Sequence, residues 1–424
     1  MNQNKTIRNL FRILAILTMG NLYLLIFFNN LPFPFSSPAL YVILWLAGLF
    51  FHYQKMFLSK GLLYIYLFII IYLIGISFFW QDRIVGTGIL ISYRWLFMRE
   101  VLPVFLAILI YTYFIKIGDF VGIAWVVLCV LIFITITAIT SIIGLNIYPM
   151  ASRDLAGGLS VRGATRLIEF YNKIGIASFG FFSGLAFAFP VLLYYFRKNW
   201  RNRTLKYIFI GMLVLFLFSI IRSGFAATFL FVALFSAAAF VARKNLKRSL
   251  VLVFIVGIIL SFTPAKYFAN ILYTASSYFT DTPLEERLYD AGATIEHPDI
   301  DLESSEHAGK RLGRIPFLLD SFAENIIIGG GEDLGHNFWF DRLSMFGLLG
   351  LFPWFLLIRY QIISNLKLFV DDFKSYYILS MVAFITYGLL KNMGGMEMMV
   401  FVFFLIPGIY YLKYLKYFPS LENK

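Results

Sequence analysis

The chain has 424 residues, of which 60% are hydrophobic, 19% are aromatic and only 14% are charged. A soluble domain carries about a quarter charged residues, so most of this surface is expected to face lipid, which excludes a cytosolic enzyme, a disulfide scaffold and a disordered chain. In a soluble protein the formal charge of +13 would suggest nucleic acid, but in a membrane protein it must first be tested against topology.

About twelve apolar stretches are long enough, or nearly so, to cross a bilayer, which needs roughly 20 residues. The first has a basic start and lacks a cleavage site, so we expect an uncleaved first span. We therefore predict an all-α polytopic membrane protein with about 12 transmembrane helices, forming one integral membrane domain over 1–424. The predicted spans are 10–28, 39–53, 61–79, 101–115, 121–143, 173–196, 207–221, 225–242, 249–264, 337–358, 376–390 and 398–414.

The loops 197–206 and 243–248 are the most basic, and Lys and Arg favour cytoplasmic loops. Placing both loops in the cytoplasm puts both termini there as well. That side then holds most of the basic residues but few of the acidic ones. The positive charge is thus interpreted as a topology signal, and no nucleic-acid partner is expected. The acidic residues predicted on this side are Asp119, Asp371, Asp372 and Glu422.

Three segments on the opposite side are too polar to be simple connections. Segment 80–100 is expected to lie on the membrane surface or to re-enter it. Segment 266–335 is the large outer loop, and a loop beyond ~15 residues is usually functional or disordered. Its apolar residues from Ile315 to Phe322 have helical spacing, which predicts an amphipathic helix with Arg311 and Arg314 near its start. The remaining segment, 146–172, carries Arg153, Arg162 and Arg166.

Arg222 is the most informative single residue, because it lies in a very short turn between two predicted spans. A cation at the membrane face is costly unless it has a partner or a water-filled cavity. It would be either a snorkelling or helix-capping arginine or part of an anion site. A guanidinium suits phosphate or pyrophosphate since it donates two parallel hydrogen bonds. Gly224 would let a large group approach the backbone.

Polar His336 and Asn337 precede the apolar stretch 338–352 and follow the glycine run 329–331. The histidine would be a hydrogen-bonding group at a helix end or a proton acceptor near neutral pH. Asn337 is a candidate N-cap. The glycine run would be a flexible turn, because it lacks the Gly-Lys-Ser/Thr of a phosphate-binding P-loop.

No metal or other cofactor is expected. Asp299 and Asp301 have the spacing of a carboxylate pair, but such pairs are common in acidic loops. Cys129 is the single cysteine, which leaves neither a disulfide nor a cysteine metal site. The chain also lacks a Walker motif.

Three blocks together resemble the O-antigen ligase and polymerase superfamily of bacterial inner membranes. That family has an S-R-G-like turn, an Arg-led helix ending in P-x-x-G-x-G, and H-[NS]-x-x-L…G-L-x-G-L. This chain departs from the pattern at Ile326, where the family usually has proline, and at Ser223, which separates the arginine from the glycine. The blocks are Arg222-Ser-Gly-Phe-Ala-Ala, Arg311…Asn325-Ile-Ile-Ile-Gly-Gly-Gly331 and His336-Asn-Phe-Trp-Phe-Asp-Arg-Leu-Ser-Met-Phe-Gly-Leu-Leu-Gly-Leu351.

The resemblance implies a glycosyltransferase with a GT-C-like fold that is independent of metal and nucleotide. Its donor would be an oligosaccharide on undecaprenyl pyrophosphate at the periplasmic face of the inner (cytoplasmic) membrane, which makes 266–335 a periplasmic loop. By the resemblance, Arg222 and Arg311 would bind the pyrophosphate, and His336 would be the catalytic base or orient the acceptor. Glu324 or Asp333 would be alternative bases. Further candidates for pyrophosphate binding are Arg314, Arg162 and Arg166.

Three activities fit this sequence. We favour an O-antigen or exopolysaccharide polymerase, because polymerases diverge to match their own repeat units and this chain matches the family irregularly. A ligase that transfers the glycan to lipid A-core shares the same motifs. A lipid-linked glycan flippase is less favoured, since a transporter should carry charges near the midplane of its spans. A polymerase would work with a flippase and a chain-length regulator.

Overall fold

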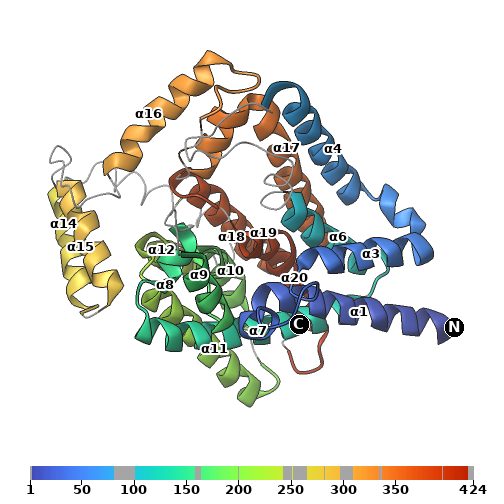
Figure 1. The fold of residues 1–424 in the computed structure, drawn as a ribbon. Helices are drawn as coiled ribbons and strands as arrows, with labels where there is room; N and C mark the ends of the chain where they lie inside the picture. Colours follow the sequence, from blue (N-terminus) through green and yellow to red (C-terminus); the bar gives the residue numbers. More distant parts are fainter. Residues whose placement is uncertain are drawn as a thin grey trace.

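The computed structural model describes residues 2–80, 101–157, 164–198, 200–241, 251, 265–280, 282–296, 309–332, 334, 337–393 and 395–418. Every regular element within these ranges is helical, as the composition predicts. Seven helices in this part of the chain are long and apolar enough to cross a membrane. The protein is therefore a polytopic helical membrane protein (Figure 1).

The predicted apolar stretches coincide with helices, except 249–264, which lies outside the described residues apart from Val251. The count of twelve spans therefore stays a prediction. Shorter apolar helices are α3 (Pro38–His52), α6 (Leu102–Lys116) and α12 (Ala226–Val241), and the chain starts with α1 (Asn2–Tyr23). The long spans are α4 with the π-helical turn η2 (Lys60–Trp80), α7 (Phe120–Ile147), α10 (Phe179–Arg197), α11 (Arg203–Arg222), α17 (Phe338–Leu368), α18 (Asp371–Leu390) and Met396–Tyr414.

The core of the bundle is formed by α10 and the last span, which consists of α19 (Met396–Val400), η4 (Phe401–Leu405), α20 (Ile406–Ile409) and η5 (Tyr410–Tyr414). Their side chains are buried on every side. A helix that is apolar all round belongs in the centre of a large bundle. Figure 1 shows α10, α18 and α19 near the middle, with α4 and α11 towards the outside.

Contacts between helix ends define two ends of the bundle. At one, which we call the Arg197 end, Lys198 after α10 forms an ion pair of 3.0 Å with Asp372 at the start of α18. At the other, the Arg222 end, Arg222 of α11 donates a hydrogen bond to the Asn146 side chain near the end of α7. Which end faces the cytoplasm stays a prediction.

Segment 266–335 is largely helical where it is described. Its helices are α14 (Ala265–Ser277), α15 (Pro283–Glu296) and α16 (Gly309–Glu324). The helix predicted from apolar spacing near Arg311 is thus confirmed as α16. Helices α14 and α15 pack together at the edge of the molecule (Figure 1). The segment 80–100 lies outside the described residues after Trp80.

Candidate active site

Arg222 ends α11 in a tight turn that leads into α12. The buried Ser223 hydroxyl donates to the Ile220 carbonyl at 2.7 Å. Gly224 has a φ of +67°, in the left-handed region that glycine adopts without strain. Glycine is therefore required here by the turn, whereas the sequence suggested that it admits a ligand.

The Arg222 guanidinium is only partly used by the protein. One terminal nitrogen donates to the Asn146 side chain. Its Nε atom is buried and has no hydrogen-bond partner. A buried donor left unsatisfied costs about 1–3 kcal/mol. The bond to Asn146 is exposed to solvent, so the guanidinium combines a buried Nε with an exposed outer end, a geometry that fits both a snorkelling arginine and an anion site.

Arg153 meets the same turn from the short helix α8 (Ala151–Gly157). Its Nη2 atom donates to the Gly224 carbonyl at 2.8 Å, while its Nη1 atom is buried without a partner. Helix α8 is fixed beside the start of α10 because the Ser152 hydroxyl donates to the Ala177 carbonyl at 2.9 Å. Burial, together with the positive charge of Arg287, lowers the pKa of Arg153 to about 10. Arg153 therefore remains a cation at neutral pH.

Arg287 reaches this region from α15. The helix is anchored by buried Leu284 and Leu288, which belong to a small apolar cluster with Ile221 and Ala226 of the turn. Arg287 lies 3.8 Å from Asp290, and its Nε atom is buried without a hydrogen-bond partner. We call Arg153, Arg222 and Arg287 the arginine cluster.

The arginine cluster combines positive charge with unused donors. Glu286 and Asp290 offset part of the charge felt by Arg153. They leave one buried N–H group on each arginine without an acceptor. An anion with several oxygens would satisfy these donors, and arginine pairs with phosphate oxygens by charge-assisted hydrogen bonds.

The residues predicted beside Arg222 are located only in part. Arg311 and Arg314 lie in the first turns of α16, and their side chains are not among those that the structure describes. Arg166 is exposed in α9 (Ala164–Lys173), and Glu324 is exposed at the end of α16. Their predicted roles stay predictions. The predicted site residues that fall outside the described residues are Arg162, His336, Asp333, Asp299 and Asp301.

The glycine run is part of a backbone clasp, which we define as residues 326–331 packed against a break in α17. Gly347 has a φ of +63° and interrupts the helix. The N–H groups of Leu348 and Leu349 each donate at 3.0 Å to the carbonyls of Ile326 and Ile327. A Cβ on Gly329 would lie 2.4 Å from the Ser344 carbonyl oxygen. The run is therefore a tight structural contact and differs from the flexible turn that the sequence suggested.

Two charged residues are buried at the start of α17. Asp341 is almost fully buried and accepts hydrogen bonds from the backbone N–H groups of Leu334 and Asn337, at 3.2 and 2.9 Å. Asn337 occupies the N-cap position as predicted, but its side chain forms no capping bond. Buried Arg342 lies 4.9 Å from the Phe338 ring centroid. Sequence reasoning missed this pair, although an Asp-Arg dipeptide inside an apolar stretch is an available signal.

Tyr387 of α18 connects the start of α17 with the helices around the arginine cluster. Its hydroxyl lies 2.8 Å from Thr228 in the first turn of α12 and 3.0 Å from Ser183 of α10. Four residues further on, the Lys391 carbonyl accepts the Phe338 N–H at 3.1 Å. The start of α17 and the arginine cluster therefore belong to the same end of the bundle.

Glu397 is a further carboxylate at this end that sequence reasoning missed. It lies in the first turn of α19, where the Tyr23 hydroxyl donates to its backbone carbonyl at 2.7 Å. Its carboxylate forms no ion pair with another described residue and accepts a hydrogen bond from its own backbone N–H. A Cβ on neighbouring Gly395 would lie 3.2 Å from Gly180 of α10. The preceding Phe179 packs against Phe225, 5.0 Å between ring centroids, which places Glu397 near the Arg222 turn.

Within the described residues, no group of three or more His, Cys, Asp or Glu side chains is arranged to hold a metal ion. Neither the family models, nor the curated proteins, nor the solved structures with which the chain was compared match it.

Proposed function

We propose that this protein is a membrane glycosyltransferase whose arginine cluster binds the pyrophosphate of a lipid-linked glycan donor. The observation that carries the proposal is that Arg153, Arg222 and Arg287 each keep a buried N–H group without an acceptor among the described residues. The cluster lies at one end of an apolar bundle, where the diphosphate of a membrane-anchored lipid would be found. The resemblance of the Arg222, Arg311 and His336 blocks to O-antigen polymerases and ligases supports the same substrate class.

In the proposed reaction an acceptor hydroxyl attacks the anomeric carbon of the donor glycan. A new glycosidic C–O bond forms, and the bond between the anomeric carbon and the pyrophosphate oxygen breaks. The departing lipid pyrophosphate gains negative charge in the transition state, so fixed guanidinium donors lower the barrier. As the resemblance implies, the scheme uses neither a nucleotide nor a metal ion.

The proton of the acceptor hydroxyl passes to a base at the Arg222 end. His336 is the candidate from the sequence, since its ordinary pKa suits proton transfer at neutral pH. Glu397 is the candidate that the structure adds, because its carboxylate lies near the Arg222 turn and forms no ion pair with another described residue. Loss of polymer in His336→Ala but not in Glu397→Gln would assign the base to the histidine, and the reverse result would assign it to the glutamate.

We further propose that the reaction joins undecaprenyl-pyrophosphate-linked repeat units, with a flippase and a chain-length regulator as partners. Deletion of the gene, followed by a polysaccharide gel, tests this. A lipid A-core bearing a single repeat would support the polymerase. A bare core with polymer left on the carrier would indicate a ligase, and accumulation of unflipped repeats would indicate a transporter.

The orientation is a separate part of the proposal, with the Arg222 end in the periplasm and both termini in the cytoplasm. Tyr278, after α14, is 78% exposed and suits a cysteine substitution in a Cys129→Ser background. A membrane-impermeant maleimide should label Tyr278→Cys in intact cells. The matched variant Lys416→Cys, at the Arg197 end of the bundle, should react only after permeabilisation. Labelling of Lys416→Cys alone would reverse the orientation.

A further inference from the structure

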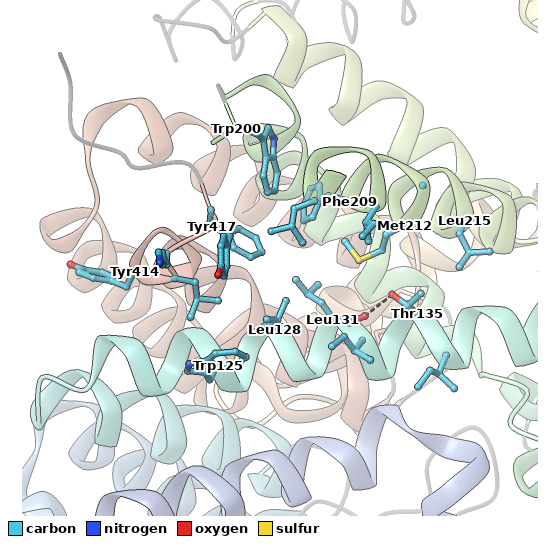
Figure 2. Close-up of a pocket in the computed structure, with 18 of the residues that line it drawn as sticks. Trp125, Leu128, Leu131, Thr135, Trp200, Phe209, Met212, Leu215, Tyr414 and Tyr417 are labelled. Carbon is cyan, nitrogen blue, oxygen red and sulfur yellow. Dashed lines mark hydrogen bonds between the residues drawn. The ribbon is translucent and has the colours of Figure 1, made fainter. Parts of the chain in front are cut away.

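An apolar groove of about 660 Å³ opens on the outside of the bundle, away from the Arg222 turn. Its walls are α7, α11 and the residues that follow the last span (Figure 2). The last span starts beside Gly180, at the Arg222 end of α10, and runs towards the Arg197 end. Tyr417 follows the last turn of this span and is therefore close to the Arg197 end. The groove is therefore distinct from the arginine cluster.

Gly211, in the middle of α11, lines this groove. A Cβ on Gly211 would have no atom within 4 Å. Glycine in a membrane helix commonly lets a second helix approach closely, but no described helix approaches here. The missing side chain instead adds to the volume of the groove, although glycine lowers the helix propensity relative to alanine. This points to an occupant that is not part of the described protein.

Two polar groups along the groove are already satisfied by the protein. The Thr135 hydroxyl donates to the Leu131 carbonyl at 2.7 Å, and the Trp200 indole N–H donates to the Tyr195 carbonyl at 2.9 Å. The remaining lining is almost entirely aliphatic and aromatic. The part of the ligand inside the groove must therefore be hydrocarbon, because it would find no free polar partner on these walls.

The groove is at least as long as one leaflet of a bilayer. Its lining residues extend from Leu205 to Leu215 on α11 and from Val121 to Ile136 on α7, which corresponds to about 15 and about 22 Å at 1.5 Å per residue. The hydrocarbon core of a bilayer is about 30 Å thick, so one leaflet contributes about 15 Å. A single acyl chain would fill the groove from the interface to the midplane.

The end of the groove near the chain terminus carries the features of a membrane interface. Exposed Tyr414 and Tyr417 lie there with Trp200, and Trp and Tyr are enriched at the level of lipid headgroups (Figure 2). Lys416 is exposed, has no ion pair among the described residues and lines the groove. Arg203, exposed just before Leu205, adds positive charge to the same side. No acidic residue lines the groove.

We propose that this groove binds one acyl chain of an anionic phospholipid from the leaflet at the Arg197 end, with the lipid phosphate beside Lys416. The apolar walls select a lipid chain, and the cationic rim selects the headgroup. Each cation near a membrane surface favours an anionic lipid by roughly fivefold.

The test uses tryptophan fluorescence of the full-length protein in two sets of phosphatidylcholine vesicles. Both sets contain the same minor fraction of phosphatidylglycerol. In one set the phosphatidylglycerol carries dibrominated acyl chains, and in the other set an equal amount of the phosphatidylcholine carries them. We expect stronger quenching by brominated phosphatidylglycerol, since Trp125 and Trp200 line the groove. The excess should disappear in the double variant Trp125→Phe/Trp200→Phe. Equal quenching in the two sets for the wild type would overturn the proposal.

Two variants separate the walls of the groove from its rim. Gly211→Leu places a side chain in the groove, where its Cβ would meet no atom within 4 Å, and should abolish the excess quenching. Val214→Leu, at an exposed position of α11 outside the groove, is its matched control and should retain the excess. Lys416→Gln should reduce the preference for phosphatidylglycerol by roughly fivefold. An unchanged preference in Gly211→Leu, or displacement of the brominated lipid by equimolar undecaprenyl phosphate, would contradict the assignment to a phospholipid.

Discussion

Arginine side chains at the two ends of the bundle differ in whether the protein supplies hydrogen-bond acceptors for them. At the Arg197 end, Arg12 donates to both carboxylate oxygens of Asp119 at 2.7 and 2.5 Å, and Arg197 donates to the Ala239 and Phe240 carbonyls at the end of α12. At the Arg222 end, each member of the arginine cluster keeps a buried donor without an acceptor. Arginine side chains are therefore paired within the protein at one end, whereas at the other end each keeps a donor for which the described residues offer no acceptor.

The largest effect is expected when the available donors are removed. Arg222→Ala or Arg153→Ala should reduce glycan transfer by about 10²- to 10³-fold, as measured for single donors to a transition-state anion. Arg222→Lys should also impair transfer, because a point charge replaces the two-pronged guanidinium. The measurement is the amount and length of surface polysaccharide at equal protein insertion. Arg12→Ala is the control from the other end and should retain transfer; normal polymer in Arg222→Ala would remove the pyrophosphate site.

A second comparison uses two glycines with similar positive φ angles. Gly347 has a φ of +63° in the clasp, and Gly118 has a φ of +68° before α7. A Cβ on Gly347 would lie 2.5 Å from the Gly329 nitrogen, whereas a Cβ on Gly118 would meet nothing within 4 Å. Gly347→Ala should therefore destabilise the fold by about 2–4 kcal/mol, and Gly118→Ala by only about 1–2 kcal/mol. Thermal unfolding in detergent measures both, and equal losses would argue against the clasp.

Breaking the ion pair of Arg12 should lower stability while leaving activity intact. Asp119 is 6% exposed, so Arg12→Ala leaves a nearly buried carboxylate without its cation. Since Arg12 itself is 30% exposed, we expect a loss of about 1–3 kcal/mol. The double variant Arg12→Ala/Asp119→Asn should recover part of it, because asparagine retains an acceptor for the Gly122 N–H. The exposed Arg166→Ala is the control, and an equal loss there would show that the pair contributes nothing.

The smallest effect is expected at the surface pair of Lys198 and Asp372. Asp372 is 45% exposed, and water screens its interaction with the ammonium group 3.0 Å away. Lys198→Ala should change the free energy of unfolding by about 0–1 kcal/mol, and less at high salt. Unfolding at low and high ionic strength measures this. A loss of stability that does not depend on salt and is as large as that of Arg12→Ala would mean that Lys198 stabilises the fold as a buried ion pair does.

The sequence predicted those parts of the molecule that depend on local pattern. Apolar runs located the helices, and the spacing around Leu318 located α16, because hydropathy and helical period are properties of short windows. Arg222 was found because a charge in a short turn between spans is unusual. Arg153 and Arg287 were not found, since α8 and α15 meet the Arg222 turn only after folding. Glu397 was missed for the same reason, because it lies near that turn only through Gly180 and Phe179.

By itself, the sequence determined that this chain is a polytopic helical membrane protein and that its cations are unevenly distributed. Both follow from sums over residues, which need no knowledge of distances. Only the tertiary structure decided which cations are neutralised and which keep free donors, because hydrogen bonds and ion pairs depend on atoms within about 3–4 Å that are far apart in the chain. Arg12 and Arg197 are thus paired within the protein at the Arg197 end, whereas each member of the arginine cluster at the Arg222 end keeps one donor without an acceptor among the described residues.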